Sequence, residues 1–234
     1  MRAVILAGGL GMRLRPYTTI LPKPLVPIGD RPVLEHILRS LSACGVREID
    51  LCIGHLGELI QVYFSQRTSL PEGLELRWHW EEEPLGTAGA VAVVPDLDDT
   101  FIAMNGDVLT TLDYRALVDY HREAKATLTV AMHAQRVDID LGVIESNDGV
   151  ITGYREKPTL HYDVSMGIYV YEPRALQFLP NGPCQFPELV QRLLDAGEPV
   201  AAYRNDADWY DIGTFAEYER ATQYLADRPG PFGA

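Results

Sequence analysis

Strand patterns and helix patterns alternate over the first 110 residues of the chain. Short apolar runs predict strands, and between them apolar residues recur at the three- and four-residue spacing of a helix. Such alternation implies a mostly parallel sheet that is covered on both faces by helices. The predicted strands are 4–6, 49–53, 74–80 and 100–104, and the predicted helical segments are 32–41, 59–63 and 87–93.

After about residue 126 the pattern changes to a series of strands. The predicted strands are 128–133, 142–145, 150–154, 167–171 and 200–203, and the predicted helices are 173–178, 187–195 and 215–225. The whole pattern predicts one domain over residues 1–226, a Rossmann-like three-layer α/β sandwich with a mixed, mostly parallel central sheet. Residues 227–234 are rich in Pro and Gly, and we expect them to form a flexible tail.

The composition excludes several classes of protein. A formal net charge of −13 does not suit a general nucleic-acid binder, which needs a basic face. No apolar run approaches the roughly 18 residues of a membrane span, and the N-terminus is predicted to be a first strand rather than a signal peptide. Cys44, Cys52 and Cys184 follow no disulfide or zinc pattern. We therefore expect a cytoplasmic protein in a reducing compartment, with neither nucleic acid nor a membrane as partner.

Lysine is rare, and two of its three positions are followed by proline. Of 20 basic residues only Lys23, Lys125 and Lys157 are lysines; Lys23 and Lys157 each precede a proline. Lysine carries a compact charge on a flexible stem and is not interchangeable with arginine around phosphate. Chance remains the alternative for a sample of three. The pattern indicates that Lys23 and Lys157 bind a phosphorylated ligand.

A glycine-rich loop follows the first predicted strand. Gly8, Gly9 and Gly11 let backbone N–H groups approach phosphate oxygens, and Arg13 and Arg15 add charge in the same loop. No Gly-Lys-Ser/Thr follows, so the loop is not a Walker A motif, and the third glycine of the dinucleotide motif is missing. A plain tight turn is the alternative interpretation.

Carboxylates stand at two other informative places. Asp107 ends an apolar strand, where open α/β sheets bind ligands at their carboxyl edge. Asp211 precedes the last predicted helix. A turn at Asp107 and a helix start at Asp211 are the alternatives. Together the two residues predict a hard-oxygen Mg²⁺ site.

Taken in chain order, these motifs resemble those of the sugar-1-phosphate nucleotidylyltransferases. The resemblance extends from Met1 to about Leu225, and residues 81–89 are most similar to the mannose-1-phosphate guanylyltransferases. It implies the nucleotide-diphospho-sugar transferase fold, with a nucleotide-binding half at about 1–110 and a sugar-phosphate-binding half at about 111–226. The matching motifs are residues 6–16, 22–24, 84–89, 105–107, 156–158, 167–169 and 211–214.

The resemblance also implies a role for each matching residue. The residues expected to bind the nucleotide are Leu6, Ala7, Gly8, Gly9, Gly11, Arg13, Glu81, Pro84, Gly86 and Thr87. Those expected to bind the sugar phosphate are Lys23, Asn105, Gly142, Glu156, Lys157 and Gly167. Asp107 and Asp211 are expected to hold Mg²⁺, and the catalytic set is Arg13, Lys23, Asp107 and Lys157. The six histidines are expected to be structural or surface residues.

These roles suit the transfer of a nucleoside monophosphate from an NTP to a sugar 1-phosphate, with release of pyrophosphate. The attacking phosphate oxygen is already an anion, so the reaction needs no general base. The site must instead position two polyanions in line and relieve their repulsion.

The nucleobase depends on Glu81. Guanine offers adjacent N1–H and N2–H₂ donors that a carboxylate can bind in bidentate fashion, whereas glutamine would suit uracil or thymine. We therefore expect GTP and a manno-configured sugar, either mannose 1-phosphate or a heptose 1-phosphate. A UTP- or dTTP-dependent glucose-1-phosphate enzyme is the alternative if Glu81 points into solvent.

Other functions share parts of the pattern. Choline-phosphate cytidylyltransferases and cofactor guanylyltransferases have similar N-terminal signatures, but residues 156–158 and 211–214 favour sugar phosphates. A non-catalytic nucleotide-sugar-sensing subunit is less favoured because Arg13, Lys23, Asp107 and Asp211 are all retained. The chain stops at Ala234, so we expect neither an acetyltransferase domain nor extra regulatory helices. We expect the protein to be a monomer or a homodimer.

Overall fold

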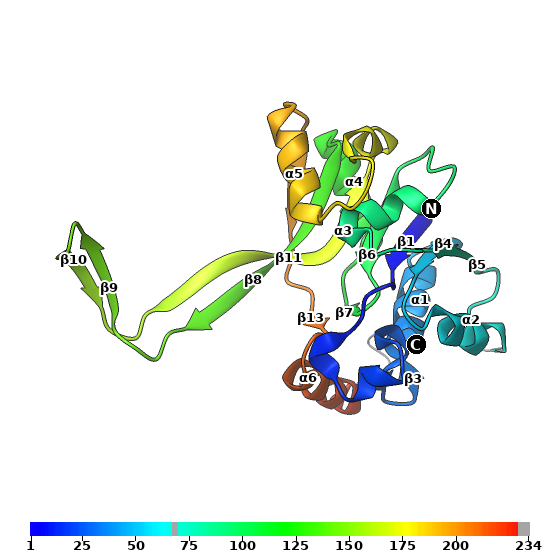
Figure 1. Ribbon diagram of the computed structural model, residues 1–234, viewed down its shortest axis with the longest axis horizontal. Helices are drawn as coiled ribbons and strands as arrows, with labels where there is room; N and C mark the ends of the chain where they lie inside the picture. The colour runs from blue at the N-terminus through cyan, green and yellow to red at the C-terminus, as the bar shows by residue number, and fades with distance from the viewer. Residues whose placement is uncertain (67–69, 229–234) are drawn as a thin grey trace.

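The computed structural model describes residues 1–66 and 70–228. Seven strands form the central sheet: β1 (Arg2–Leu6), β4 (Glu48–Ile53), β5 (Glu75–Trp80), β6 (Phe101–Asn105), β8 (Leu128–Asp138), β11 (Thr159–Tyr171) and β12 (Val200–Arg204). Their order is β12-β8-β11-β6-β1-β4-β5 (Figure 1). Neighbouring strands are parallel except at β11, which is antiparallel to both β6 and β8. The predicted mixed, mostly parallel sheet is confirmed.

Helices cover both faces of this sheet. They are α1 (Val33–Ala43), α2 (Gly57–Ser65), α3 (Gly86–Gly89), α4 (Tyr114–Ala124), α5 (Phe186–Asp195) and α6 (Phe215–Asp227). Ala3 and Ile5 of β1 pack in one buried cluster with residues of α1, α2, α4 and α6. Val4, between them in sequence, packs in a second cluster with residues of α3 and α5. Successive strand residues thus enter opposite cores, and the three-layer sandwich follows.

Short elements connect the layers and shape one edge of the sheet. The predicted helix 87–93 divides into α3 and the 3₁₀ turn η4 (Ala90–Val93). The other 3₁₀ turns are η1 (Met12–Leu14), η2 (Tyr17–Thr19), η3 (Lys23–Leu25) and η5 (Pro173–Phe178). The remaining strands form three pairs: β2 (Pro27–Ile28) with β3 (Arg31–Pro32), β7 (Val108–Thr110) with β13 (Trp209–Asp211), and β9 (Val143–Asn147) with β10 (Val150–Arg155).

Helix α4 lies where the sequence patterns predicted no helix. The carboxylate of Asp113 caps its first turn by accepting from the backbone N–H groups of Arg115 and Ala116. Its buried face includes Leu117 and His121. The imidazole of His121 is satisfied by the hydroxyl of Thr129 at 2.7 Å. The buried residues Tyr114, Leu117, Val118 and His121 recur at the spacing of one helix face, so the periodicity was present in the sequence. Tertiary hydrogen bonding makes the histidine position suit the core.

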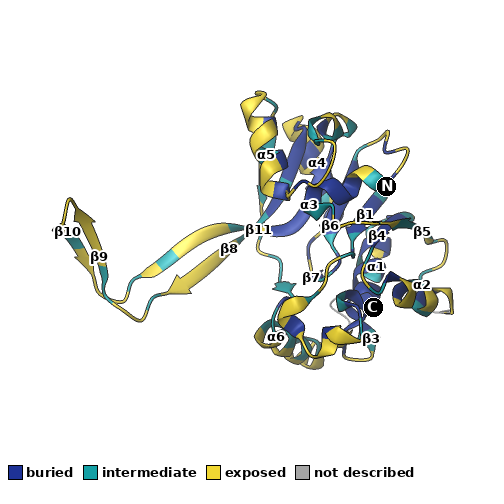
Figure 2. Cartoon of the chain, viewed as in Figure 1, coloured by how far each residue is buried: buried dark blue, intermediate teal, exposed yellow. Residues whose placement is uncertain are grey.

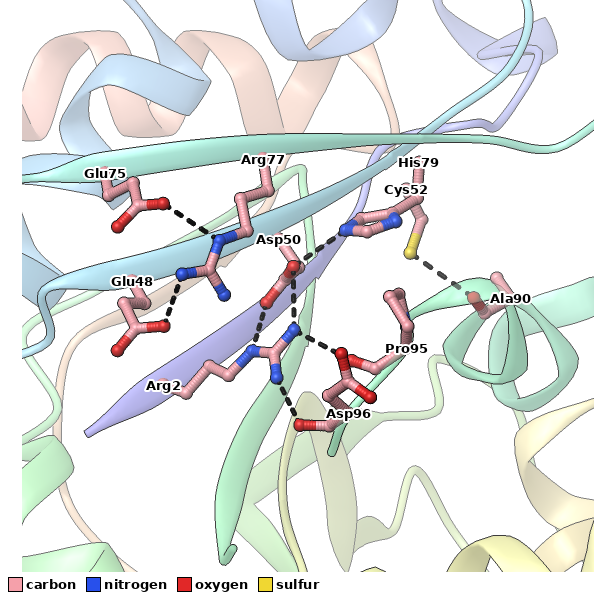
Figure 3. Close-up of polar contacts among 10 residues, drawn as sticks. All are labelled: Arg2, Glu48, Asp50, Cys52, Glu75, Arg77, His79, Ala90, Pro95 and Asp96. Carbon is pink, nitrogen blue, oxygen red and sulfur yellow. Dashed lines mark hydrogen bonds and ion pairs between the residues drawn. The ribbon is translucent and has the colours of Figure 1, made fainter. Parts of the chain in front are cut away.

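A buried carboxylate ties the first strands together on one face of the sheet (Figure 3). Asp50 on β4 is fully buried and accepts two hydrogen bonds from the guanidinium of Arg2, at 2.6 and 3.1 Å. The imidazole of His79 lies 2.7 Å from the same carboxylate. Arg2 also donates to the carbonyl of Pro95 at 3.0 Å. This network joins β1, β4 and β5 to the loop before β6, so it fixes the strands whose ends carry the glycine loop.

A long two-stranded arm projects from the sheet. We use "the arm" for residues 134–164 and "the body" for the other described residues. The outer parts of β8 and β11 form its shaft, and the β9–β10 pair forms its tip (Figure 1). Every residue of the arm is exposed or only half-buried (Figure 2). The predicted strands 128–133 and 167–171 cover only the inner, buried ends of β8 and β11, because the shaft has no buried face to impose a pattern.

Both the N-terminus and the last described helix belong to the body. Asp227 closes α6 rather than beginning a tail, and residues 229–234 of the predicted tail lie outside the described residues.

Within residues 1–66 and 70–228, no helix has the length and apolar character that a membrane span requires. Cys44, Cys52 and Cys184 are free thiols.

Candidate active site

A cleft of about 800 Å³ lies at the carboxyl ends of the parallel strands. It is bounded by the segments that follow β1, β4, β5 and β6, the edge where open α/β sheets bind ligands. Ala7 is buried behind the glycine loop and does not line the cleft. Ten predicted site residues do line it: Leu6, Gly8, Gly9, Gly11, Glu81, Pro84, Gly86, Thr87, Asn105 and Asp107.

The glycine loop forms one wall of this cleft. Gly11 has φ +60°, and a Cβ at that position would lie 2.9 Å from Cγ2 of Thr18. The Thr18 hydroxyl donates to the carbonyl of Gly11 at 2.7 Å, so the turn is held from both sides. A Cβ at Gly9 would meet nothing within 4 Å. Gly11 is therefore required by the fold itself, whereas the open surface at Gly9 leaves room for a ligand to approach the backbone.

The two aspartates lie together although 104 residues of sequence separate them. Strands β7 and β13 pair in a register that places Asp211 opposite Val108. The backbone N–H of Ile212 also donates to the carbonyl of Asp107 at 2.9 Å. The Lys23 amine contacts the Asp107 carboxylate directly and lies 4.0 Å from that of Asp211. Burial raises the pKa of Asp211, and the negative charge of Asp107 adds to that rise.

This carboxylate pair has the donor set that a magnesium ion prefers. One oxygen of Asp107 is buried without a protein hydrogen-bond partner, and so is the side-chain oxygen of Asn105. Among the described residues, no group of three or more His, Cys, Asp and Glu side chains could hold a metal ion. Mg²⁺ is usually bound by one or two carboxylates together with substrate phosphates and water. Asp107 and Asp211 therefore fit a metal ion whose other ligands come from the substrate.

Glu81 points into the cleft rather than into solvent. Its carboxylate accepts from the backbone N–H of Leu85 at 3.3 Å and lies directly against Gly8. Burial raises its pKa, and the hydrogen bond from Leu85 opposes part of that rise. The neighbouring Glu83 is exposed. Glu82 also lines the cleft but its side chain is exposed, so Glu81 is the one of the three consecutive glutamates that is half-buried in the cleft.

The turn after these glutamates is held by a distant part of the chain. Gly86 has φ +76°, and a Cβ there would lie 2.6 Å from the carbonyl oxygen of Cys184. That carbonyl accepts from the N–H groups of both Ala88 and Gly89 at 3.0 Å. Gln185 follows and lines the cleft. Gly86 is therefore required by close packing between two backbones.

Arg13 lines a second, smaller recess of about 310 Å³ instead of the 800 Å³ cleft. Its guanidinium lies against Gly213, where a Cβ would be 2.9 Å from Nη2. Asp211 and His133 line the same recess, and Nδ1 of His133 is buried without a hydrogen-bond partner among the described residues. Because Lys23 bridges Asp211 to Asp107, this recess and the cleft meet at the aspartate pair.

The predicted sugar-phosphate residues divide between two places. Asn105 and Gly167 lie in the body, where a Cβ on Gly167 would meet the Asn105 amide. Gly142, Glu156 and Lys157 lie on the arm where the shaft meets the tip, directly before β9 and directly after β10. The hydroxyl of Tyr154 donates to Glu156 at 3.1 Å, and a Cβ on Gly142 would lie 3.2 Å from the same carboxylate. The structure therefore gathers these three residues with one another but not with Lys23 and Asp107.

Nine lining residues were not predicted: Leu10, Met12, Gly54, His55, Glu58, Trp80, Glu82, Ala90 and Gln185. Gly54 and His55 directly follow a predicted strand, and Trp80 ends another, so the rule of carboxyl ends could have found them. No sequence signal marks Gln185, since tertiary packing alone brings it to the cleft.

The comparison with known sequences agrees with this geometry. The sequence profile described as "Nucleotidyl transferase" matches residues 2–228. The D-glycero-alpha-D-manno-heptose 1-phosphate guanylyltransferase of Aneurinibacillus thermoaerophilus is 35% identical, and the match covers 96% of this chain and 98% of that enzyme. The UTP–glucose-1-phosphate uridylyltransferase of Synechocystis is 34% identical over 97% of this chain and 64% of its own length. The chain thus spans less than two thirds of this second relative.

Solved structures show the same fold. HddC from Yersinia pseudotuberculosis has a TM-score of 0.77 and 26% identity, with 96% of this chain and 99% of that chain covered. Its complex with GMP-PN has a TM-score of 0.74 and 25% identity, with 96% and 99% covered. With the profile, the sequence relatives and the cleft geometry in agreement, the chain belongs to the family of sugar-1-phosphate nucleotidyltransferases.

Proposed function

We propose that this chain transfers a nucleoside monophosphate from an NTP to a sugar 1-phosphate and releases pyrophosphate. The observation that carries the proposal is the position of Lys23 between Asp107 and Asp211, where the glycine-loop cleft meets the Arg13 recess. A cation flanked by two carboxylates beside a glycine loop suits a site that handles several phosphate charges at once.

Each charged group has a task in this reaction. The oxygen of the sugar phosphate attacks the α-phosphorus while the bond to the β-phosphate oxygen breaks, and no proton has to be removed. Lys23 neutralises charge shared by the two phosphates, and Arg13 stabilises the departing pyrophosphate. Asp107 and Asp211 would hold Mg²⁺, which supplies positive charge against the α-phosphate when bound. The enzyme thus contributes positioning and charge neutralisation rather than acid–base chemistry.

GTP is the proposed nucleotide. Glu81 faces the cleft, and a carboxylate there can accept from both N1–H and N2–H₂ of guanine. Uracil or thymine would offer one N–H flanked by carbonyl oxygens that repel the carboxylate. The GMP-PN complex of HddC and the guanylyltransferase relative support this choice.

The proposed acceptor is a manno-configured sugar 1-phosphate of mannose or heptose type. The relative matched over nearly its whole length acts on a heptose 1-phosphate. A UTP-dependent glucose-1-phosphate enzyme is the second candidate, supported by the 34% identity to the uridylyltransferase.

A pyrophosphate-release panel tests these proposals. Each common NTP is paired with mannose, heptose and glucose 1-phosphates in the presence of Mg²⁺, and initial rates are compared at matched concentrations. We expect GTP with a manno-configured sugar to be fastest. Faster turnover of UTP or dTTP would reject the guanine assignment. Nucleotide binding without turnover of any pair would instead identify a sensing subunit.

A further inference from the structure

The arm has no support within its own chain. A two-stranded ribbon is marginally stable in water unless a third strand or another surface covers one face. Yet no residue between 134 and 164, all of them described, is buried (Figure 2). The tip lies at the far end of the molecule from the helices of the body (Figure 1). A surface outside this chain is therefore needed to cover the tip.

The tip also exposes large apolar side chains. Among them are Leu141 at 74% exposure, Val150 at 67%, Ile151 at 62%, Tyr154 at 62% and Ile144 at 54%. Tyr154 and Ile144 are directly paired across the β9–β10 ribbon, so they share one face. Apolar residues gathered in this way mark an interaction surface.

The residues expected at the sugar-phosphate site are divided between the body and the arm. Lys23, Asp107 and Asp211 lie together in the body, while Glu156 and Lys157 lie on the arm. Lys157 has φ +42°, a conformation that non-glycine residues seldom adopt and that concentrates at functional sites. Each chain therefore holds two halves of one site and keeps them apart.

The root of the arm fixes its outward direction. Paired register runs without interruption from Thr159 opposite Asp138 to Ser165 opposite Met132. The guanidinium of Arg204 on β12 contacts the carboxylate of Asp163 at the base of the shaft. The arm is thus a continuous ribbon held to the neighbouring strand, rather than a loop that hangs over its own cleft.

We propose that two copies of this chain exchange arms, so that the tip of each arm completes the sugar-phosphate site of the other copy. This inference rests on the proposed function. Glu156 and Lys157 of one copy then face Lys23 of the second, and the sugar phosphate binds between the two chains. A closed pair with two-fold symmetry leaves neither tip uncovered.

The surface around the cleft suits such a tip. Residues 9–23, from the glycine loop to Lys23, lie beside the cleft and its acidic lining residues Glu58, Glu81, Glu82 and Asp107. The same segment exposes Ile20 at 79%, Tyr17 at 59% and Met12 at 53%. Exposed apolar area is therefore present on both surfaces, the arm of one copy and the glycine-loop side of the other.

Complementation between two inactive variants tests the exchange. Lys23→Ala disables the body's half of the site, and Glu156→Gln with Lys157→Ala disables the arm's half. When the two are co-expressed, half of the dimers contain one of each, and each such dimer has one site built from an intact body and an intact arm. We therefore expect about a quarter of wild-type pyrophosphate release.

The matched control co-expresses Lys23→Ala with Asp107→Asn, both in the body, and it must release no more pyrophosphate than the more active of the two parents. A complementing pair that is folded and dimeric but no more active than either parent would overturn the exchange, because arms then act within their own chain. Wild-type turnover in the same assay separates this result from a failure of the proposed function.

The mass in solution gives an independent readout. By light scattering we expect about 52 kDa for the wild type, twice the 26.1 kDa of one chain. Ile144→Asp with Tyr154→Asp is expected to give monomers, whereas Leu194→Asp, an exposed apolar position on α5, is expected to leave the dimer intact. A fully active wild-type monomer, or a dimer unaffected by the tip variant, would contradict the proposal. This measurement decides the exchange even if no substrate pair is turned over.

Discussion

The cleft at the strand ends and the arm are stabilised in opposite ways, although both carry residues expected at one active site. The cleft lies at the ends of β1, β4 and β6, whose inner residues are buried. Its loops are fixed by backbone hydrogen bonds and close glycine contacts. The arm has only its ladder hydrogen bonds, and its side chains face solvent. The cleft is therefore preorganised by its own chain, while the arm's residues gain a fixed position only against another surface.

The largest effect is expected at the centre of the cleft. Lys23→Ala should lower kcat/KM by two or more orders of magnitude, about 3 kcal/mol of transition-state stabilisation, because two phosphate charges then lack their shared cation. Thermal unfolding should be nearly unchanged. Lys125→Ala, at the C-terminus of α4, is the matched lysine control and should retain wild-type rates. A folded Lys23→Ala enzyme with normal turnover would remove this residue from the mechanism.

The aspartate pair should show strong coupling. Asp107→Asn and Asp211→Asn should each lower the rate about 30- to 100-fold and raise the Mg²⁺ concentration needed for half-maximal activity. The double variant should lose much less than the product of the two, because either change degrades the same ion site. The measurement is a Mg²⁺ titration of initial rate for all four proteins. Full activity in excess EDTA would refute the assignment of both residues.

The arm should affect only the second substrate. Lys157→Ala is expected to raise the KM for the sugar 1-phosphate about tenfold or more, with NTP affinity by calorimetry unchanged, because the nucleotide cleft lies wholly in the body. Lys23→Ala differs because it should lower kcat as well. Arg155→Ala, on the same ribbon, is the control for a general loss of positive charge. If Lys157→Ala weakened NTP binding as much as sugar 1-phosphate binding, the cleft and the arm would not bind separate substrates.

Base selection in the cleft should respond to both mutation and pH. Glu81→Gln should reduce the preference for GTP over UTP about tenfold, which is about 1.4 kcal/mol, since glutamine cannot accept from both guanine donors. The pKa of Glu81 is raised by burial, and only the ionised form binds guanine in this way. The GTP preference of the wild type should therefore decline with falling pH, beginning above the range of an ordinary glutamate, and Glu81→Gln should abolish that decline. Competition assays between pH 5 and 8 measure it.

The smallest effect distinguishes two glycines of one loop. Gly11→Ala should lower the free energy of unfolding by about 1–2 kcal/mol, because φ is positive and the methyl group meets Thr18. Gly9→Ala should leave stability unchanged, since nothing lies within 4 Å, but should raise the KM for the NTP. Denaturant unfolding and steady-state kinetics separate the two. If Gly11→Ala and Gly9→Ala unfolded with the same free energy, the fold would not require a glycine at position 11.

Much of the body could be predicted from local sequence patterns. Strands such as β1 and helices such as α1 have apolar residues at a clear period, because each has a face that must be buried. The glycine loop and the residues after Met104 were found because they end predicted strands, and strand ends gather at one edge of the sheet. Helix α4 was missed although its buried residues recur at helical spacing, and hydrogen bonds with Thr129 and Glu172 satisfy the imidazole of His121 in the core.

What the sequence determined by itself is the α/β class and the alternation of strands and helices over the first 110 residues, and its motifs predict which groups bind phosphate. These depend on periodicity and short motifs, which are local properties of the chain. Tertiary structure alone decided that Lys23 contacts Asp107 from 84 residues away, that the carbonyl of Cys184 holds the turn at Gly86, and that Glu156 and Lys157 stand apart on an arm. These depend on how distant segments pack, and an exposed ribbon has no buried face from which a sequence pattern could reveal its direction.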